Sequence, residues 1–346
     1  ADLTCIIKNK YGKVEMSTSF SSNHNFSKGF FYVADGTFNF YDTEKKTAYQ
    51  DCYASLNAGK TLGIGNYDSA NIIHSNGKFY LLVGTSTSNR DHFYIVDAKT
   101  LYYENSAVVG ANLSGLTILN EQYGLVTGDG IRRIDLKSLN NVRIKNERLL
   151  CFYNSIIYNG KVLSNDTYKD ESKVKYYDVN ELIAAKEGEA PAVTELDIIQ
   201  KQKINFVLAK DGNVYTLESA DNGCNIVKIK NDFTLEKVFA NFQPAKGPYH
   251  SSPTIGMVAS ETENIIYLVS TDGAIYKYIL GDSDSLKAPF IAAESGVSIT
   301  APLQLNQQSG ELYVTYTEEL KDESKIVVYS KDGKVLHTVD CGESVP

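Results

Sequence analysis

The strongest constraint on this chain is a strand-like segment that recurs seven times and ends each time in a short polar turn. Within each copy apolar and polar residues alternate, which is typical of a β-strand with one buried face. The turns begin at Asp42, Asp97, Asp135, Asp178, Lys230, Ile279 and Ser330. Their spacing averages about 48 residues, the length of one propeller blade or kelch-sized unit. The repeat therefore predicts a β-propeller.

Four of the seven turns begin with an aspartate at the end of the strand. An aspartate there accepts hydrogen bonds from backbone N–H groups two residues further on and so starts a tight turn. We therefore interpret Asp42, Asp97, Asp135 and Asp178 as structural residues with no catalytic role.

The remaining strands of each repeat are separated by Asn-Gly, Asp-Gly and Ser-Gly pairs, which supply the positive φ angles of hairpin turns. Four strands per repeat predict an all-β chain: one seven-bladed β-propeller of four-stranded antiparallel blades, a single domain over residues 1–346. A spare strand at 2–9 (DLTCIIKN) is expected to complete the C-terminal blade, so that the N-terminal strand closes the ring. The segment 178–193 is expected to insert a short helical turn ending at Gly188.

Charge argues against a nucleic-acid-binding protein. The net charge is −8, whereas nucleic-acid-binding faces usually carry a basic stripe. Arg132 and Arg133 are neighbours in a predicted strand, so their side chains are expected on opposite faces of the sheet. The chain has 24 tyrosines and no tryptophan, which disfavours propellers whose repeats carry a Trp-Asp pair.

Neither cysteines nor histidines form a recognisable metal or redox motif. The five cysteines show no C-x-x-C spacing, and the five histidines share no short spacing, so we predict no metal and no cofactor. Most cysteines are expected to be small buried side chains. The alternative for one pair is a disulfide between Cys5 and Cys341, which lie near the two chain ends that a propeller brings together.

The N-terminus is consistent with export. The chain starts at Ala1 without a methionine, so we expect that a signal peptide was removed. No apolar run reaches 18 residues, so no membrane-spanning helix is predicted. The sequons at Asn25, Asn112 and Asn165 carry little weight, because short sequons arise by chance.

Two segments carry a family resemblance. The first, residues 35–83, contains Gly59, Leu62 and Gly63 after a strand ending in a tyrosine and an acidic turn. The second contains a Ser-Gly-x-Leu-Tyr-Val strand at 309–314 and a Tyr-Ser-x-Asp-Gly turn at 329–333. Both resemble YncE-like (YVTN-type) propellers, in particular exported surface lipoproteins of gut anaerobes. The resemblance implies a seven-bladed propeller in an outer-membrane-anchored or periplasmic setting and no established enzymatic activity. Some relatives bind cobalamin and pass it to an outer-membrane transporter.

Candidate ligand-binding residues lie in the connections between blades and between second and third strands, which gather on one face of a propeller. The most distinctive is GPYHSSPT (247–254), in which Tyr249 and His250 are flanked by prolines and are suited to a flat ligand. TSTSNRDH (85–92) offers Arg90 and His92 for an anion. The candidates are completed by Asn66 and Tyr67. Each of these segments has an alternative interpretation as a solvated turn, and no catalytic residue is assigned.

Three functions remain open. The preferred one is a monomeric, exported β-propeller that binds a small molecule and serves as an accessory lipoprotein of nutrient uptake. The family resemblance implies a corrinoid as a possible ligand. The second is a protein–protein scaffold of an outer-membrane complex, with a transporter as partner. The third is a propeller hydrolase or lyase, which we disfavour because the chain has no G-x-S-x-G or Cys–His nucleophile motif.

Overall fold

The structure is a computed structural model. It describes residues 5–6, 26–34, 37–58, 62, 70–83, 91–110, 115–128, 130–145, 155–165, 172–189, 191–200, 205–244, 256–299, 303–318 and 323–343. These residues form two compact units, one made of Ala1–Leu113 with Gly296–Pro346 and the other of Ser114–Ser295. Each unit is described by itself.

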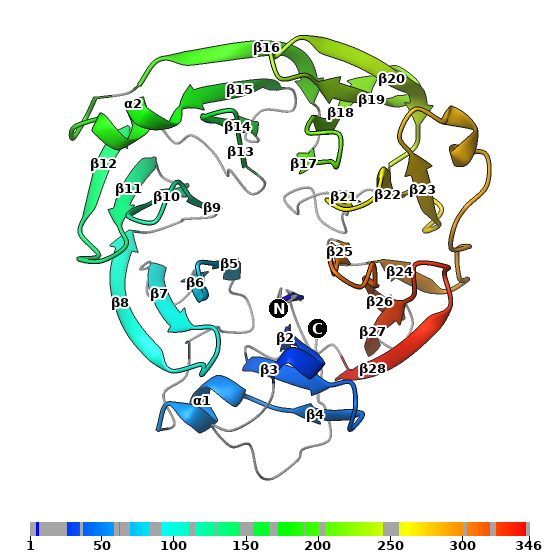
Figure 1. The fold of residues 1–346 in the computed structure, drawn as a ribbon, viewed down its shortest axis with the longest axis horizontal. Coiled ribbons are helices and arrows are strands. Elements are labelled where there is room, and N and C mark those ends of the chain that lie inside the picture. The colour runs from blue at the N-terminus through cyan, green and yellow to red at the C-terminus, as the bar shows by residue number, and fades with distance from the viewer. Residues whose placement is uncertain are drawn as a thin grey trace. The chain divides into compact units, whose positions relative to one another are not determined.

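The first unit contains the first, second and last sheets in chain order, which we call blades one, two and seven (Figure 1). Blade one consists of β1 (Cys5–Ile6), β2 (Gly29–Ala34), β3 (Thr37–Asp42) and β4 (Thr47–Tyr49), with the short helices η1 (Phe26–Lys28) and α1 (Cys52–Leu56) beside it. Blade two consists of β5 (Ala70–Ser75), β6 (Lys78–Val83), β7 (Asp91–Asp97) and β8 (Tyr103–Gly110). Blade seven consists of β24 (Val297–Ile299), β25 (Gln304–Leu305), β26 (Leu312–Glu318), β27 (Glu323–Tyr329) and β28 (Val335–Glu343).

The second unit contains blades three to six. Blade three consists of β9 (Gly115–Ile118), β10 (Tyr123–Thr127), β11 (Ile131–Asp135) and β12 (Asn141–Lys145). Blade four consists of β13 (Ile156–Tyr158), β14 (Lys161–Asn165), β15 (Ser172–Asp178), α2 (Val179–Ala184) and β16 (Val193–Gln200). Blade five consists of β17 (Val207–Leu208), β18 (Val214–Ala220), β19 (Gly223–Ile229) and β20 (Leu235–Phe242). Blade six consists of β21 (Met257–Ala259), β22 (Ile265–Val269), β23 (Ile275–Ile279) and η2 (Ser283–Leu286).

The predicted fold class is confirmed: the chain is an all-β, seven-bladed β-propeller. Consecutive strands pair antiparallel in every blade apart from β1. Two blades depart from four strands. In blade seven β24 and β25 pair with successive parts of β26. In blade six the outer position beside β23 is taken by an isolated bridge between Ile275 and Ile291.

The turn chemistry follows the sequence prediction. Each of the four strand-end aspartates accepts a hydrogen bond from the backbone N–H two residues on: Glu44 to Asp42 at 3.0 Å, Lys99 to Asp97 at 3.1 Å, Lys137 to Asp135 at 3.0 Å and Asn180 to Asp178 at 2.8 Å. The Asn76–Gly77 pair between β5 and β6 has φ angles of 50° and 71°, as two-residue hairpins of this type require.

The expectation that the N-terminal strand closes the ring is wrong. Within the described residues β1 pairs in parallel with β2 of blade one, with Cys5 opposite Phe31. Among the described strands, those of blade seven all come from the C-terminal part of the chain. The physical reason is connection length. Residues 7–28 separate β1 from β2, and a connection of a dozen or more residues permits a parallel neighbour within the same sheet.

The first and last blades are joined by side-chain packing, and we call this contact the seam. Phe30 on β2 lies 5.1 Å from Tyr313 on β26, ring centroid to ring centroid, at an interplanar angle of 68°. The other buried apolar members of the seam are Tyr32, Ala34, Tyr41, Ile326, Val328, Val339 and Cys341. Burying a large apolar side chain contributes roughly 1.5–3 kcal/mol, so a few such contacts suffice to hold the two blades together without strand exchange.

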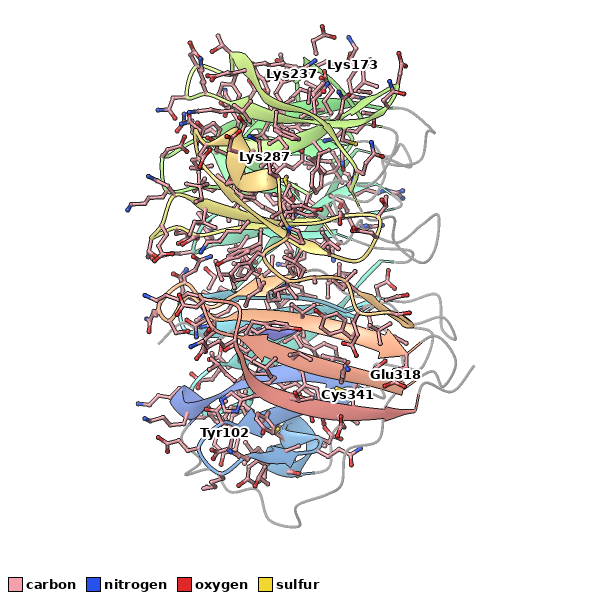
Figure 2. The ribbon with its side chains drawn as sticks, turned by 90° about the vertical axis from the view of Figure 1, so that its right-hand side faces the viewer. Tyr102, Lys173, Lys237, Lys287, Glu318 and Cys341 are labelled. Atoms are coloured by element: carbon pink, nitrogen blue, oxygen red, sulfur yellow. The ribbon has the colours of Figure 1, made fainter. Side chains whose placement is uncertain are left out.

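The disulfide considered between Cys5 and Cys341 stays a prediction, because the side chain of Cys5 lies outside those that the structure describes. Cys341 is labelled on β28, the edge strand of blade seven (Figure 2), and is fully buried in the seam. Cys5 lies on β1, the edge strand of blade one that pairs with β2. The expectation that cysteines serve as small buried side chains is confirmed for Cys52, Cys224 and Cys341.

The insertion in blade four contains a short helix, as predicted, but the helix ends at Ala184 and not at Gly188. Asp178 caps α2 by accepting hydrogen bonds from the backbone N–H groups of Asn180 and Glu181, and Gly188 has a φ of 77° after the helix. Arg133 of blade three donates to the carbonyl oxygen of Ile183 and, at 3.0 Å, to that of Ala185 at the end of α2. Arg132 instead donates to Asn141 at 3.2 Å. The two arginines therefore have separate partners, as strand alternation predicts.

No helix among the described residues has the length and apolar character needed to cross a membrane.

Candidate functional site

Of the six predicted ligand-binding residues, the structure describes His92. It is the second residue of β7, is half-buried and pairs with Val83 on β6 and Val108 on β8. Its ring stacks on that of Tyr94 with centroids 6.0 Å apart. The other five, Tyr249, His250, Arg90, Tyr67 and Asn66, lie outside the described residues, so the predicted grouping remains a prediction.

Several described strands end directly before a connection that the sequence predicts for the ligand face. In the second unit such strand ends carry buried polar side chains, although a buried polar group is costly unless it is hydrogen-bonded. Two of these side chains, Asn165 and Gln200, belong to a continuous series that we call the polar chain. Its other members are Thr216 within β18, the partly buried Asn205 before β17 and the backbone of Met257.

The polar chain runs from blade four through blade five to blade six. Asn165, the last residue of β14, donates from Nδ2 to Oε1 of Gln200 at 2.8 Å. Gln200, the last residue of β16, donates from Nε2 to Oγ1 of Thr216 at 2.9 Å and to the carbonyl oxygen of Leu217 at 3.0 Å. Thr216 on β18 then donates to the carbonyl oxygen of Asn205 at 3.1 Å. Each link therefore joins a different pair of segments.

Asn205 completes the chain by holding the start of blade six. Its Nδ2 donates to the carbonyl oxygen of Met257 at 2.5 Å, and its Oδ1 accepts from the backbone N–H of Met257 at 3.0 Å. The side-chain amide thus pairs with one residue of β21 as a neighbouring strand would. A Cβ built on Gly256 would overlap Oδ1 of Asn205, so glycine at 256 permits this contact.

Asn165, Gln200 and Thr216 are too buried to be direct ligand contacts, whereas Asn205 is partly exposed. Gln200 is 1% exposed and Thr216 is fully buried. All four side chains are neutral amides or hydroxyls, whose hydrogen bonds strengthen one another in a low-dielectric interior. Their role is to fix the strand ends from which the connections leave. Burial of Asn165 also argues against glycosylation of its sequon, since a glycan needs a surface asparagine.

Asn165 adjoins a connection between a second and a third strand, a kind of connection that the sequence predicts on the ligand face, whereas no sequence pattern marked Gln200, Thr216 or Asn205. A signal is present in hindsight, because Gln200 ends the apolar alternation of LDIIQ and Asn205 precedes the inner strand of the next blade. Only the contact between three blades distinguishes them from solvated strand ends.

A charged cluster lies at the opposite, hairpin end of blade five. Asp211 accepts hydrogen bonds from Tyr215 and Lys228, both at 2.9 Å. Burial opposes ionisation of Asp211, yet its partners Lys228 and Tyr215 bring its pKa below the usual value. Burial, and then the hydrogen bond to Asp211, raise the pKa of Tyr215 far above the usual value, so this hydroxyl keeps its proton. The cluster is a satisfied ion pair that stabilises the hairpin.

The described thiols are also unsuited to nucleophilic chemistry. Burial raises the pKa of Cys224 to about 11 and that of Cys52 further still. Thiolate formation near neutral pH is therefore negligible at both sites. Within the described ranges, no three His, Cys, Asp or Glu side chains lie together in a way that would hold a metal ion.

Comparison with known proteins identifies a family and supports the fold. The family described as "Domain of unknown function (DUF5074)" matches residues 26–341. A search of curated proteins finds no match. Among solved structures, a puromycin hydrolase is similar at 14% identity and a TM-score of 0.57, over 90% of this chain and 50% of that one.

Two other solved structures match over nearly their whole length. A functionally unknown protein from Desulfotomaculum acetoxidans has 11% identity and a TM-score of 0.53, with 90% of this chain and 94% of that chain covered. Hsv2 from Kluyveromyces lactis has 10% identity and a TM-score of 0.51, with 89% and 92% covered. At such identities these likenesses establish the fold alone.

Proposed function

The chain belongs to the DUF5074 family, and from its fold and polar chain we propose that it is a ligand-binding β-propeller without catalytic activity. The ligand is a small molecule held by the connections at the strand ends that the polar chain fixes. Of the contacts that we propose, Tyr249 and His250 lie in the sequence between Pro244 and Met257, next to the polar chain. The other proposed contacts, which stand on sequence chemistry alone, belong to the first unit: Arg90, His92, Tyr67 and Asn66.

The observation that carries the proposal is the position of the polar chain. Binding sites require their contacting groups to be held in place before the ligand arrives, because ordering them on binding weakens affinity. In this protein buried hydrogen bonds hold the ends of β14 and β16 and the start of β21. Each of these points adjoins a connection. A rigid platform bearing variable connections is the usual design of a binding protein.

We extend the proposal to the cellular setting on the basis of the resemblance to YncE-like surface lipoproteins. The protein is exported, is anchored at the outer membrane or is free in the periplasm, and acts as an accessory protein of nutrient uptake. A corrinoid is the ligand to test first, with an outer-membrane transporter as the partner that receives it.

A second candidate, the protein–protein scaffold, is favoured by one observation. Large apolar side chains are exposed at or directly before the first residue of the outer strands in several blades: Tyr102 before β8, Val193 in β16, Leu235 in β20 and Val335 in β28. Recurrence of exposed apolar residues at equivalent positions is a feature of interaction surfaces. This candidate predicts a protein partner in place of a small molecule.

Thermal unfolding in the presence of candidate ligands tests the proposal. The probes are cyanocobalamin, haemin, short glycans, Ca²⁺ and Zn²⁺. A ligand that binds only the folded state at 100 times its Kd adds about 2.7 kcal/mol to stability. A rise in the midpoint with cyanocobalamin, haemin or a glycan is the expected result. A rise with a metal ion alone would favour the enzyme alternative, and no rise with any probe would refute the proposal in favour of the scaffold.

A further inference from the structure

Hairpin turns of three blades carry an Asn-Gly pair: Asn76–Gly77 in blade two, Asn159–Gly160 in blade four and Asn222–Gly223 in blade five. The three pairs have the same two residues, yet the structure surrounds each of them differently. Differences in their reactivity therefore follow from the fold and not from the pair itself.

An Asn-Gly pair can modify itself in water. The backbone nitrogen of the glycine attacks Cγ of the asparagine side chain, the Cγ–Nδ2 bond breaks, and ammonia leaves behind a cyclic succinimide. Water then opens the ring to aspartate or to isoaspartate, in which the backbone runs through the side-chain carbon. Glycine favours the attack because it has no side chain to hinder it, and asparagine is one of the thermolabile residues of proteins.

The Asn76–Gly77 pair is open at both reacting groups. Both residues are exposed and form a two-residue turn closed by the pairing of Ser75 with Lys78. A Cβ built on Gly77 would meet no atom within 4 Å, so the space around its nitrogen is empty. Within the described part of the chain, neither the Gly77 N–H nor the Asn76 side chain makes a hydrogen bond. The attacking nitrogen and the amide are thus both unrestrained.

The other two pairs are protected in different ways. The side-chain Nδ2 of Asn159 donates to the carbonyl oxygen of Asn231 in blade five at 3.0 Å, which holds the amide that would have to rotate. Gly223 is already the first residue of β19 and pairs with Ala220, so its backbone is held in the sheet. A Cβ on Gly223 would also overlap the side chain of Gln243, so the surroundings of this glycine are crowded.

From these differences we propose that Asn76 is a site of spontaneous deamidation in the folded protein, and that Asn159 and Asn222 are protected. The product has a new carboxylate on the hairpin between β5 and β6. Isoaspartate also adds a carbon to the backbone of a two-residue turn, whose length sets the register of its strands. The carbonyl oxygen of Gly77 accepts a hydrogen bond from the backbone N–H of Ala98 at 2.9 Å, so the modified turn loses its link to the turn between β7 and β8.

Peptide mapping by mass spectrometry tests the site. The folded protein is incubated at mildly alkaline pH, and conversion is followed at the three asparagines. Asn76 is expected to convert about tenfold faster than Asn159, the factor that one hydrogen bond can contribute. In urea the three asparagines are expected to convert at similar rates, because the folded surroundings are lost. Equal rates in the folded protein, or the same ranking in urea, would overturn the proposal.

Hydrogen exchange at the Ala98 amide tests the structural effect. The purified isoaspartate form is compared with Asn76→Asp, which adds the same charge without the extra backbone carbon. Protection of the Ala98 amide is expected to fall by about tenfold in the isoaspartate form and to stay unchanged in Asn76→Asp. Protection equal to that of the wild type in the isoaspartate form would overturn the effect on blade two, and an equal loss in Asn76→Asp would assign the effect to charge instead.

Discussion

Replacing Tyr32 with phenylalanine should stabilise the protein, contrary to the usual effect of a change in the interior. Tyr32 lies on β2 in the seam and is fully buried. Within the described part of the chain its hydroxyl has no hydrogen-bond partner. Burial is also the largest cause that raises the pKa of this hydroxyl far above its usual value. The hydroxyl is therefore desolvated on folding with no compensating bond.

The magnitude follows from the energetics of unsatisfied groups. Leaving a buried polar group without a partner costs about 1–3 kcal/mol, and the Tyr32→Phe change removes that group while keeping the ring. We expect a gain of about 1 kcal/mol in the free energy of unfolding, allowing for a small packing defect. Tyr158→Phe is the matched control. The Tyr158 hydroxyl donates to Asn231 at 2.6 Å and to Gly212 at 3.1 Å, so its removal should cost about 1–2 kcal/mol.

Urea unfolding at neutral pH measures both variants, with equal m-values required before the midpoints are compared. Opposite signs for the two variants are expected. A loss of stability in Tyr32→Phe as large as in Tyr158→Phe would show that the Tyr32 hydroxyl is satisfied, and the reasoning would fail.

Thr315 extends this test because its hydroxyl is also buried without a partner among the described residues. It lies two residues after Tyr313 on β26 and so faces the seam as Tyr313 does. Thr315→Val should be neutral or stabilising. The changes in the free energy of unfolding should add in the double variant Tyr32→Phe/Thr315→Val. Strong non-additivity would indicate that the two hydroxyls share a water molecule and would contradict the interpretation as two independent unsatisfied groups.

Three further predictions concern turns, packing and thiols. Hydrogen bonds, first of all from the backbone N–H of Ser138, hold the pKa of Asp135 below its usual value. The contribution of Asp135 to stability is therefore present above its unfolded-state pKa and is lost as the pH falls through its folded-state pKa. Asp135→Asn should lessen the loss of stability in acid, and an unchanged acid titration of unfolding would contradict this. Arg133→Ala removes the donor to the carbonyl groups at the end of α2 and should lower the free energy of unfolding by about 1–2 kcal/mol. Hydrogen exchange in 179–185 should become faster, and exchange equal to that of the wild type would contradict the contact. Cys52 and Cys341 are fully buried and should not react with a thiol reagent in the folded protein at pH 8. Rapid labelling of Cys341 without unfolding would show that the seam opens.

The local elements of this protein follow from its sequence because their causes are local. Alternating apolar residues and strand-end aspartates predict the blades and turns, and Asp97 and Asp135 accept the expected backbone hydrogen bonds. The start of the short helix after Asp178 follows from the capping side chain of that aspartate. The partners of Arg132 and Arg133 follow from strand alternation. Each depends on residues only a few positions apart in the chain.

The candidate site depends on contacts between blades. Asn165, Gln200, Thr216 and Asn205 belong to separate strands or connections, and no sequence spacing encodes that one amide will reach the next. The proposed contacts Tyr249 and His250 stand on sequence chemistry alone, and the structure contributes the fixed flanks at Pro244 and Met257.

What the sequence by itself determined is the repeat: seven blades, their hairpins and the absence of a basic or nucleophile motif, because periodicity and turn residues act within one blade. What only the tertiary structure decided is how blades meet. The N-terminal strand pairs with its own blade, since a long connection permits parallel pairing as readily as exchange with another sheet. The seam is closed by Phe30 and Tyr313, and the polar chain joins three blades, because burial and hydrogen-bond partners are set by residues hundreds of positions or whole blades apart.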